Sequence, residues 1–169
     1  MAGNVEFKDY SLECKAALDD EAIAWLYTWA PEIAAQTARN ATMEGDLGKQ
    51  LRGSYDSHVD EAKGEAQVGT PLEAGYWEEF GTGEYAAKGN GRDGWWIYIP
   101  GQASGRGGAT YATREEAEKM AQYIRTKYGK TAIVTNGRRP SYALENAFKA
   151  VTTRAESDLE ERLARRTSE

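Results

Sequence analysis

Hydrophobic residues recur every three or four positions in three stretches of the chain, and this spacing predicts three main helices. The first helix is expected from residue 19 or 20 to about residue 39, with Pro31 inside it. A proline there removes one backbone hydrogen bond and should kink the helix or divide it in two, and the kink is favoured because the periodicity continues on both sides. The middle helix should open at a capping box formed by Thr113 and Glu116 and close at Gly129. Its buried stripe would include Ala117, Met120, Ala121 and Ile124.

The third predicted helix opens after Pro140 and runs to about residue 166. About 25 helical residues at about 1.5 Å each would span roughly 38 Å, which is longer than a small domain needs. We therefore expect the outer half of this helix to pack on another copy or to fray.

Alternating and β-rich stretches predict several short strands. Residues 54–62 and 66–70 favour a hairpin, residues 95–99 and 131–135 favour two further strands, and residues 5–8 a short edge strand. Residues 45–54 are predicted as a glycine-punctuated link, in which Leu47 and Leu51 are spaced for one helical turn, and residues 84–94 and 101–108 as glycine-rich loops. The pattern predicts one α+β domain over residues 1–169, in which a small antiparallel sheet is packed by an N-terminal, a middle and a long C-terminal helix.

One aromatic turn stands out between the hairpin and the first glycine-rich loop. It consists of Tyr76, Trp77, Glu78, Glu79, Phe80, Gly81, Thr82 and Gly83. The three aromatic residues fall at helical spacing, which predicts a short turn with a buried aromatic face. The glycines allow a positive φ or a close approach by another segment. Two carboxylates beside aromatic residues are costly unless a partner holds them.

Charge divides the chain unevenly. Residues 1–85 carry 6 basic and 17 acidic side chains, whereas residues 86–169 carry 15 basic and 10 acidic ones. This asymmetry fits differently solvated faces, or an acidic face of one copy meeting a basic face of the next. The net charge of −6 disfavours a dedicated DNA-binding protein. The five Trp and ten Tyr suit interfaces, since each combines apolar area with a polar tip.

The sequence offers no combination of residues suited to catalysis or metal binding, and we expect neither an enzyme nor a cofactor. His58 and Cys14 are the only residues of their kinds, which leaves no zinc cluster and no intrachain disulfide. Residues 89–94 fit the pattern GxGxxG, but they precede a predicted strand instead of following one. A lone cysteine, no secretory signal and no long apolar run together predict a cytoplasmic protein outside membranes.

Three segments resemble, in order, the neck (head–tail joining or tail-completion, minor capsid) proteins of long-tailed bacteriophages. The resemblance is carried by three groups of residues: Gly45, Asp46 and Leu47 with Ser54; Tyr76 with Glu79, Phe80, Gly81, Thr82 and Gly83; and Pro140, Ser141 and Tyr142 with Ala147. Trp77, Arg138 and Arg139, which lie beside these motifs, are further candidate interface residues. The family has a Thr where this chain has Glu44, and its short members lack the strand–helix–strand insertion at about residues 85–137.

The resemblance implies a virion structural protein, assembled in the host cytoplasm, that joins the DNA-filled head to the tail. It would form a homo-oligomeric ring between portal-adaptor, other neck and tail proteins. DNA passing through the lumen of the ring is a further candidate partner. As part of the signature, Glu79 is expected to be an anchoring carboxylate that binds backbone amides or an arginine, with Arg138 and Arg139 as candidates. A small nucleic-acid-binding or nucleic-acid-modifying protein that uses the basic C-terminal half, or a cytoplasmic regulatory binding module, are the alternatives.

Overall fold

The computed structural model describes residues 11–100 and 108–166, with side chains from residue 15 onward in the first helix. The helices are α1 (Ser11–Asn40), α2 (Gly45–Ser54), α3 (Glu73–Phe80), α4 (Arg114–Tyr128) and α5 (Ala143–Arg166). The strands are β1 (Asp56–Asp60), β2 (Glu65–Gly69), β3 (Thr82–Gly83), β4 (Trp96–Tyr98), β5 (Ile133–Thr135) and β6 (Gly137–Arg138). The predicted strand at residues 5–8 and most of the second glycine-rich loop lie outside the described residues.

The α+β class is confirmed, but the single sheet is not. The described strands form three separate two-stranded antiparallel sheets, β1–β2, β3–β6 and β4–β5. The predicted hairpin is present, with Asp56 opposite Gly69 and Asp60 opposite Glu65. The sheets β3–β6 and β4–β5 each pair a segment before α4 with a segment after it. The two ends of the predicted insertion therefore lie next to each other.

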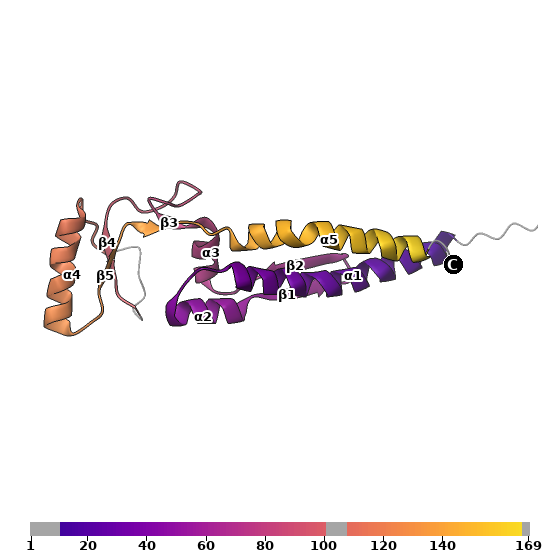
Figure 1. The fold of residues 1–169 in the computed structure, drawn as a ribbon, viewed down its shortest axis with the longest axis horizontal. Helices are drawn as coiled ribbons and strands as arrows, with labels where there is room; N and C mark the ends of the chain where they lie inside the picture. Colours follow the sequence, from indigo (N-terminus) through magenta and orange to yellow (C-terminus); the bar gives the residue numbers. More distant parts are fainter. Residues whose placement is uncertain (1–10, 101–107, 167–169) are drawn as a thin grey trace, which may run out of the picture.

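The main body is a rod in which α1 and α5 lie side by side and run in opposite directions, with the β1–β2 hairpin packed along α1 (Figure 1). Trp25 Nε1 donates to the carbonyl of Ala155 at 2.6 Å, and Trp29 Nε1 donates to Asp158 Oδ2 at 2.8 Å. The outer half of α5 therefore packs on α1 of the same chain, so the expectation that it frays is wrong, and a contact of its other face with another copy stays a prediction. The two indole rings contribute apolar area while their N–H groups are satisfied by α5.

Two local features extend further than predicted. Residues 45–54 form the helix α2 throughout and not a link with one helical turn, because Leu47 and Leu51 place an apolar face against Met43 and Ala74. The first helix begins at Ser11, earlier than expected, and Pro31 does not divide it, in agreement with the periodicity on both sides of the proline.

The core is made chiefly of small side chains. Among the described residues, ten of the thirteen buried hydrophobic residues are alanines, and the others are Met43, Leu51 and Val151. Alanine on facing helices allows close approach but removes little apolar area from water. Many large hydrophobic side chains therefore remain at least partly exposed.

The insertion forms a lobe at the end of the rod opposite the end of α5 (Figure 1). Its helix α4 begins and ends as predicted: Thr113 Oγ1 accepts from the amide of Glu116 at 3.3 Å, and Gly129 closes the helix in the left-handed conformation. The predicted stripe is only half correct. Ala117 and Ala121 are buried, but Met120 is 40% exposed.

Candidate functional site

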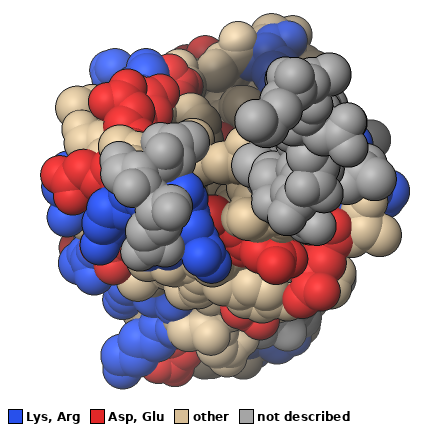
Figure 2. All heavy atoms as spheres, turned by 90° about the vertical axis from the view of Figure 1, so that its right-hand side faces the viewer, with Lys and Arg blue, Asp and Glu red and all other residues tan. Residues whose placement is uncertain are grey.

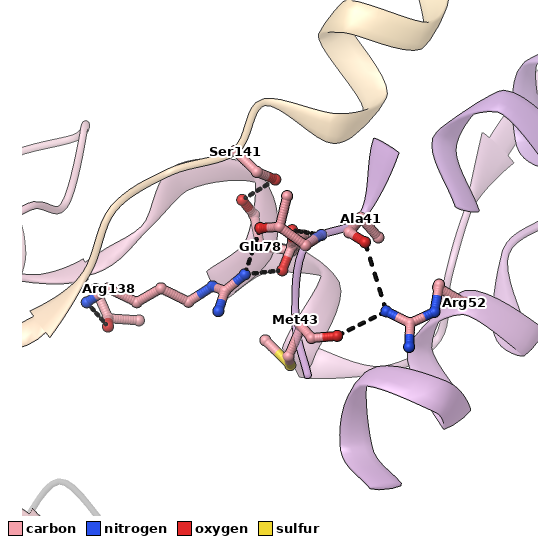
Figure 3. A network of polar contacts seen from close by, with 8 residues as sticks. Ala41, Met43, Arg52, Glu78, Arg138 and Ser141 are labelled. Atoms are coloured by element: carbon pink, nitrogen blue, oxygen red, sulfur yellow. Dashed lines mark hydrogen bonds and ion pairs between the residues drawn. The ribbon is translucent and has the colours of Figure 1, made fainter. Parts of the chain in front are cut away.

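The residues of the aromatic turn meet the residues around Pro140 in a polar joint between the rod and the lobe. Glu78, on α3, is the centre of this joint and has no exposed surface. Its Oε1 accepts from the backbone amide of Thr42 at 2.6 Å and from the Thr42 hydroxyl at 2.9 Å. Its Oε2 accepts from Nη2 of Arg138 at 2.7 Å (Figure 3).

Backbone contacts extend this network to the start of α5. The carbonyl oxygen of Glu78 accepts from both the amide and the hydroxyl of Ser141, each at 2.9 Å. On the other side, Arg52 of α2 donates to the carbonyl of Met43 at 2.6 Å (Figure 3). The short loop between α1 and α2 is thus held from both sides, by Glu78 and by Arg52.

The charge of Glu78 is stabilised in place. Burial alone would raise the pKa of its carboxyl, but the hydrogen bonds from Thr42 and the positive charge of Arg138 outweigh it and hold the pKa below its usual value. Burial is the main reason that the pKa of Tyr55 is raised to about 12, and the negative charges of Glu78 and Glu79 add to it. Nε of Arg138 is buried with no hydrogen-bond partner in the structure, so the pair is tight but not fully satisfied.

Glu79 is an anchoring carboxylate, as expected, and it binds backbone amides. Its Oε2 accepts from the amide of Leu144 at 2.8 Å and its Oε1 from the amide of Glu145 at 3.1 Å. These are free donors of the first turn of α5, where a negative charge is also favoured by the helix dipole. The arginine expected as the other option, Arg138, pairs with the neighbouring Glu78 instead.

The Gly–Thr–Gly part of the turn forms β3 and fits closely against β6. Gly81 has φ +70°, and a Cβ there would lie 2.7 Å from the carbonyl oxygen of Arg138 and 2.9 Å from Pro140. Gly83 has φ +62°, and a Cβ there would lie 2.1 Å from the carbonyl oxygen of Asn136. Between them, Thr82 accepts at its hydroxyl from the amide of Arg138 at 3.0 Å. Both glycines are therefore required by conformation and by space.

The aromatic face of α3 is not the buried face, contrary to the prediction. The buried positions are Ala74, Gly75 and Glu78, whereas Tyr76 is 42% exposed. The rings of Tyr76 and Phe80 lie 5.0 Å apart, and Nζ of Lys88 lies 3.9 Å from the Phe80 ring centroid. Tyr76 and Phe80 therefore form an exposed aromatic surface that the ammonium group of Lys88 contacts.

The first motif of the resemblance, Gly45, Leu47 and Ser54, lies in and around α2, next to the joint. Leu47 and Trp77 both pack against the buried cluster of Met43, Leu51 and Ala74. Ser54 donates to the carbonyl of Leu51 at 2.8 Å, and its Oγ lies 2.6 Å from Oγ1 of Thr70. Gly45 opens α2 at φ +72° with no other atom near its missing Cβ, so it supplies a turn and not a contact.

The structure brings Glu79, Gly81, Thr82, Gly83, Arg138 and Pro140 together, and leaves Arg139 on the surface. The guanidinium of Arg139 lies 4.7 Å from the ring centroid of Tyr85. Sequence reasoning missed Thr42, named Ser141 only as part of the third motif of the resemblance, and left Glu78 without a role. The signal for Glu78 was its position four residues after Ala74, on the face of α3 that is buried.

The two charged halves of the chain already pair within one molecule. Arg138, Arg154, Arg162 and Arg166 of the basic half lie within 2.7–3.7 Å of Glu78, Glu32 and Glu21 of the acidic half. At the end of the rod where α5 ends, Lys and Arg side chains lie beside Asp and Glu side chains (Figure 2). A hollow of about 330 Å³ there is lined by Glu21, Arg162, Arg165 and Arg166. This pairing reduces the charge left for nucleic acid or for a half-to-half contact between copies.

The described residues contain no group of three or more His, Cys, Asp or Glu arranged to hold a metal ion. His58 lies exposed on β1. None of the helices in the described part of the chain is long and apolar enough to span a membrane. Comparisons of the chain with protein-family models, with curated proteins and with solved structures found no match.

Proposed function

We propose that this protein is a structural component of the neck of a long-tailed bacteriophage, a connector that forms a ring and joins head to tail without catalysing a reaction. The observation that carries the proposal is the convergence of two separate segments of the resemblance. Glu79 anchors the first turn of α5, and Gly81 packs beneath Pro140. Signature residues that lie about 60 positions apart thus serve one structural purpose, which is to fix the rod, the lobe and α5 relative to one another.

A rigid joint suits a connector more than it suits an enzyme or a binding module. A ring repeats one contact many times, so small errors in the angle between rod and lobe would prevent closure. Buried polar contacts such as Glu78 with Arg138 favour one arrangement over close alternatives. The neighbours in this proposal are other copies of the chain, a portal-adaptor protein above and tail proteins below, with DNA passing through the lumen.

The proposal is tested in a phage that encodes the protein, by stopping its synthesis with a nonsense codon and supplying variants from a plasmid. Without the protein, electron microscopy should show filled heads and separate tails, and the plasmid-borne wild type should restore joined particles. Gly81→Val should fail to restore them, because a β-branched residue cannot adopt this conformation cheaply. Normal numbers of joined, infectious particles in the absence of the protein would overturn the proposal.

A further inference from the structure

An apolar groove of about 800 Å³ runs along the rod between α1, β2, α3 and α5. Its lining includes the aromatic side chains of Trp25, Trp29, Tyr76, Phe80 and Phe148. Phe148 is 57% exposed, although it continues the apolar stripe of α5. The small side chains of the core leave Tyr76 and Phe148 exposed and the other rings only partly buried, so the groove is a surface on which a partner would gain stability by removing apolar area from water.

The charges around the groove restrict what can occupy it. Its described lining contains three carboxylates, Glu79, Glu145 and Glu156, and neither Lys nor Arg. Glu79 is engaged by α5, and Glu145 pairs with Lys149 on its outer side. Lys88 already places its ammonium group over the rings at one end of the groove. The carboxylate of Glu156 and the lack of Lys and Arg in the described lining therefore favour an apolar occupant with a basic residue at its edge over an acidic one.

The lobe of the same chain carries a surface of that kind, at the C-terminal end of α4. Met120, Tyr123, Tyr128 and Ile133 are between 40% and 56% exposed. The rings of Tyr123 and Tyr128 meet edge to face with centroids 6.2 Å apart. Lys127 lies over both rings and donates to the hydroxyl of Tyr123. Residues 119–135 contain four Lys or Arg and no Asp or Glu, and one of the four, Arg125, pairs with Glu118. We call this surface the basic aromatic tip.

The tip cannot fill the groove of its own molecule. The lobe extends away from the rod beyond the β3–β6 joint, and α4 lies at the far end of the molecule (Figure 1). Filling the groove with the tip would require the joint to break, and the joint is held by the buried Glu78 and by the close contact of Gly81 with β6. The apolar occupant with a basic edge is therefore the tip of a second copy.

We propose that the basic aromatic tip of one copy inserts into the apolar groove of the next, and that this contact is the repeated interface of the assembly. The inference rests on the proposed function, since it names the partner surface of the ring. Each copy would use its groove on one side and its tip on the other. Such a heterologous contact builds a ring when the rotation closes and an open filament when it does not. Tyrosine residues flanked by a cation are typical of the central residues of interfaces.

The experiment uses the full-length chain and two variants that alter exposed side chains only. Phe148→Glu adds a charge to the groove, and Lys127→Glu with Tyr128→Glu removes one ring of the tip and lowers the net charge of residues 119–135 from +4 to +1. Sedimentation velocity should show that each variant weakens self-association by about thirtyfold or more. Tyr27→Gln is the matched control, because Tyr27 is 53% exposed on α1 outside both surfaces. It should assemble like the wild type, and circular dichroism should show all variants folded.

Mixing the two variants gives the decisive result. Each variant lacks a different half of the interface, so an equimolar mixture should form a 1:1 complex that grows no further. In a Cys14→Ser background, mixing chains carrying Phe148→Cys with chains carrying Tyr128→Cys should give a disulfide-linked dimer, whereas pairing Tyr27→Cys with Tyr128→Cys should not.

Several outcomes would overturn the inference. If the wild type assembles and neither variant weakens it, the interface lies elsewhere and the proposed function is unaffected. If only the groove variant weakens assembly, the groove holds a different occupant. If the wild type stays monomeric at all concentrations and no disulfide forms, tip and groove do not bind each other. The proposed function is tested separately: it is overturned if joined particles form in the absence of the protein.

Discussion

The joint and the lobe are built on opposite principles, and the contrast shows what each contributes. The lobe depends on signals close together in sequence: Thr113 and Glu116 open α4, and Gly129 closes it. The joint depends on contacts between residues 36 to 66 positions apart, such as Thr42 with Glu78 and Glu79 with Glu145. A locally specified element can vary without affecting the rest of the chain. The joint cannot, because the loop at Thr42, the helix α3 and the strand β6 all depend on one buried carboxylate, that of Glu78.

The largest effect is expected from Gly81→Ala, compared with Gly129→Ala in the lobe. Both glycines have positive φ, +70° and +62°, but only Gly81 has neighbours within 3 Å of a new Cβ. We expect Gly129→Ala to cost about 1 kcal/mol through backbone conformation alone. Gly81→Ala should cost about 3 kcal/mol or more, since its extended left-handed conformation is restricted to glycine and the methyl group also collides with β6. Urea denaturation of the two variants measures this difference. Equal losses would show that the joint can move apart at little cost.

Breaking the ion pair of the joint should come second. Arg138→Met would leave the fully buried Glu78 without its cation, and we expect a loss of about 3 kcal/mol. The matched change in the lobe is Glu118→Ala, which breaks the pair with Arg125 where both side chains are more than 40% exposed. That change should cost less than about 0.5 kcal/mol. Thermal melting of both variants tests the contrast. A small effect of Arg138→Met would mean that Thr42 alone satisfies Glu78.

Two helix caps offer a comparison of intermediate size. Thr113→Ala removes a local cap from α4 and should cost about 1 kcal/mol. Glu79→Ala removes a carboxylate that accepts two amides of α5 from another element, and should cost about 1–2 kcal/mol. The losses would be measured by denaturation, and native-state hydrogen exchange would show where they act. We expect Thr113→Ala to increase exchange in α4 only, and Glu79→Ala to increase it in both α3 and α5. Increased exchange confined to α5 would argue against a shared joint.

This difference also explains what could be predicted from the sequence. The helix α4, the hairpin and the long final helix follow from periodicity, caps and turns, which are local, and the structure confirms them. The division into three sheets could not be predicted, because the partners of β3 and β4 are chosen by the position of the lobe. Packing of the outer half of α5 on α1 was missed for the same reason, since the hydrogen bonds of Trp25 and Trp29 cross about 130 residues.

The candidate site shows the same limit at the level of single residues. Glu79 was expected to bind amides or an arginine, and its amide partners confirm the first option. Glu78 was noted as costly but given no partner. Its partners Thr42 and Arg138 lie on a loop and a two-residue strand, neither of which has a periodic pattern to place it. Buried polar contacts of this kind are decided by tertiary structure, so the sequence could indicate that a partner was needed but not which one.

The smallest effect should be the pH dependence of the free energy of unfolding. It tests the charge of the joint without changing the packing of the joint. The pKa of Glu78 is lower in the folded chain than its usual value of 4.5. Its contribution is therefore fully present above pH 4.5 and is lost as the pH falls through the lower folded value, because the unfolded chain then binds the proton more tightly. Glu78→Gln removes that titration while keeping the shape. Urea denaturation at pH 7 and at pH values below 4.5 should show a shallower loss for this variant than for the wild type. Equal slopes for the two chains would mean that Glu78 titrates alike in the folded and unfolded states, and that its hydrogen bonds do not favour the charged form.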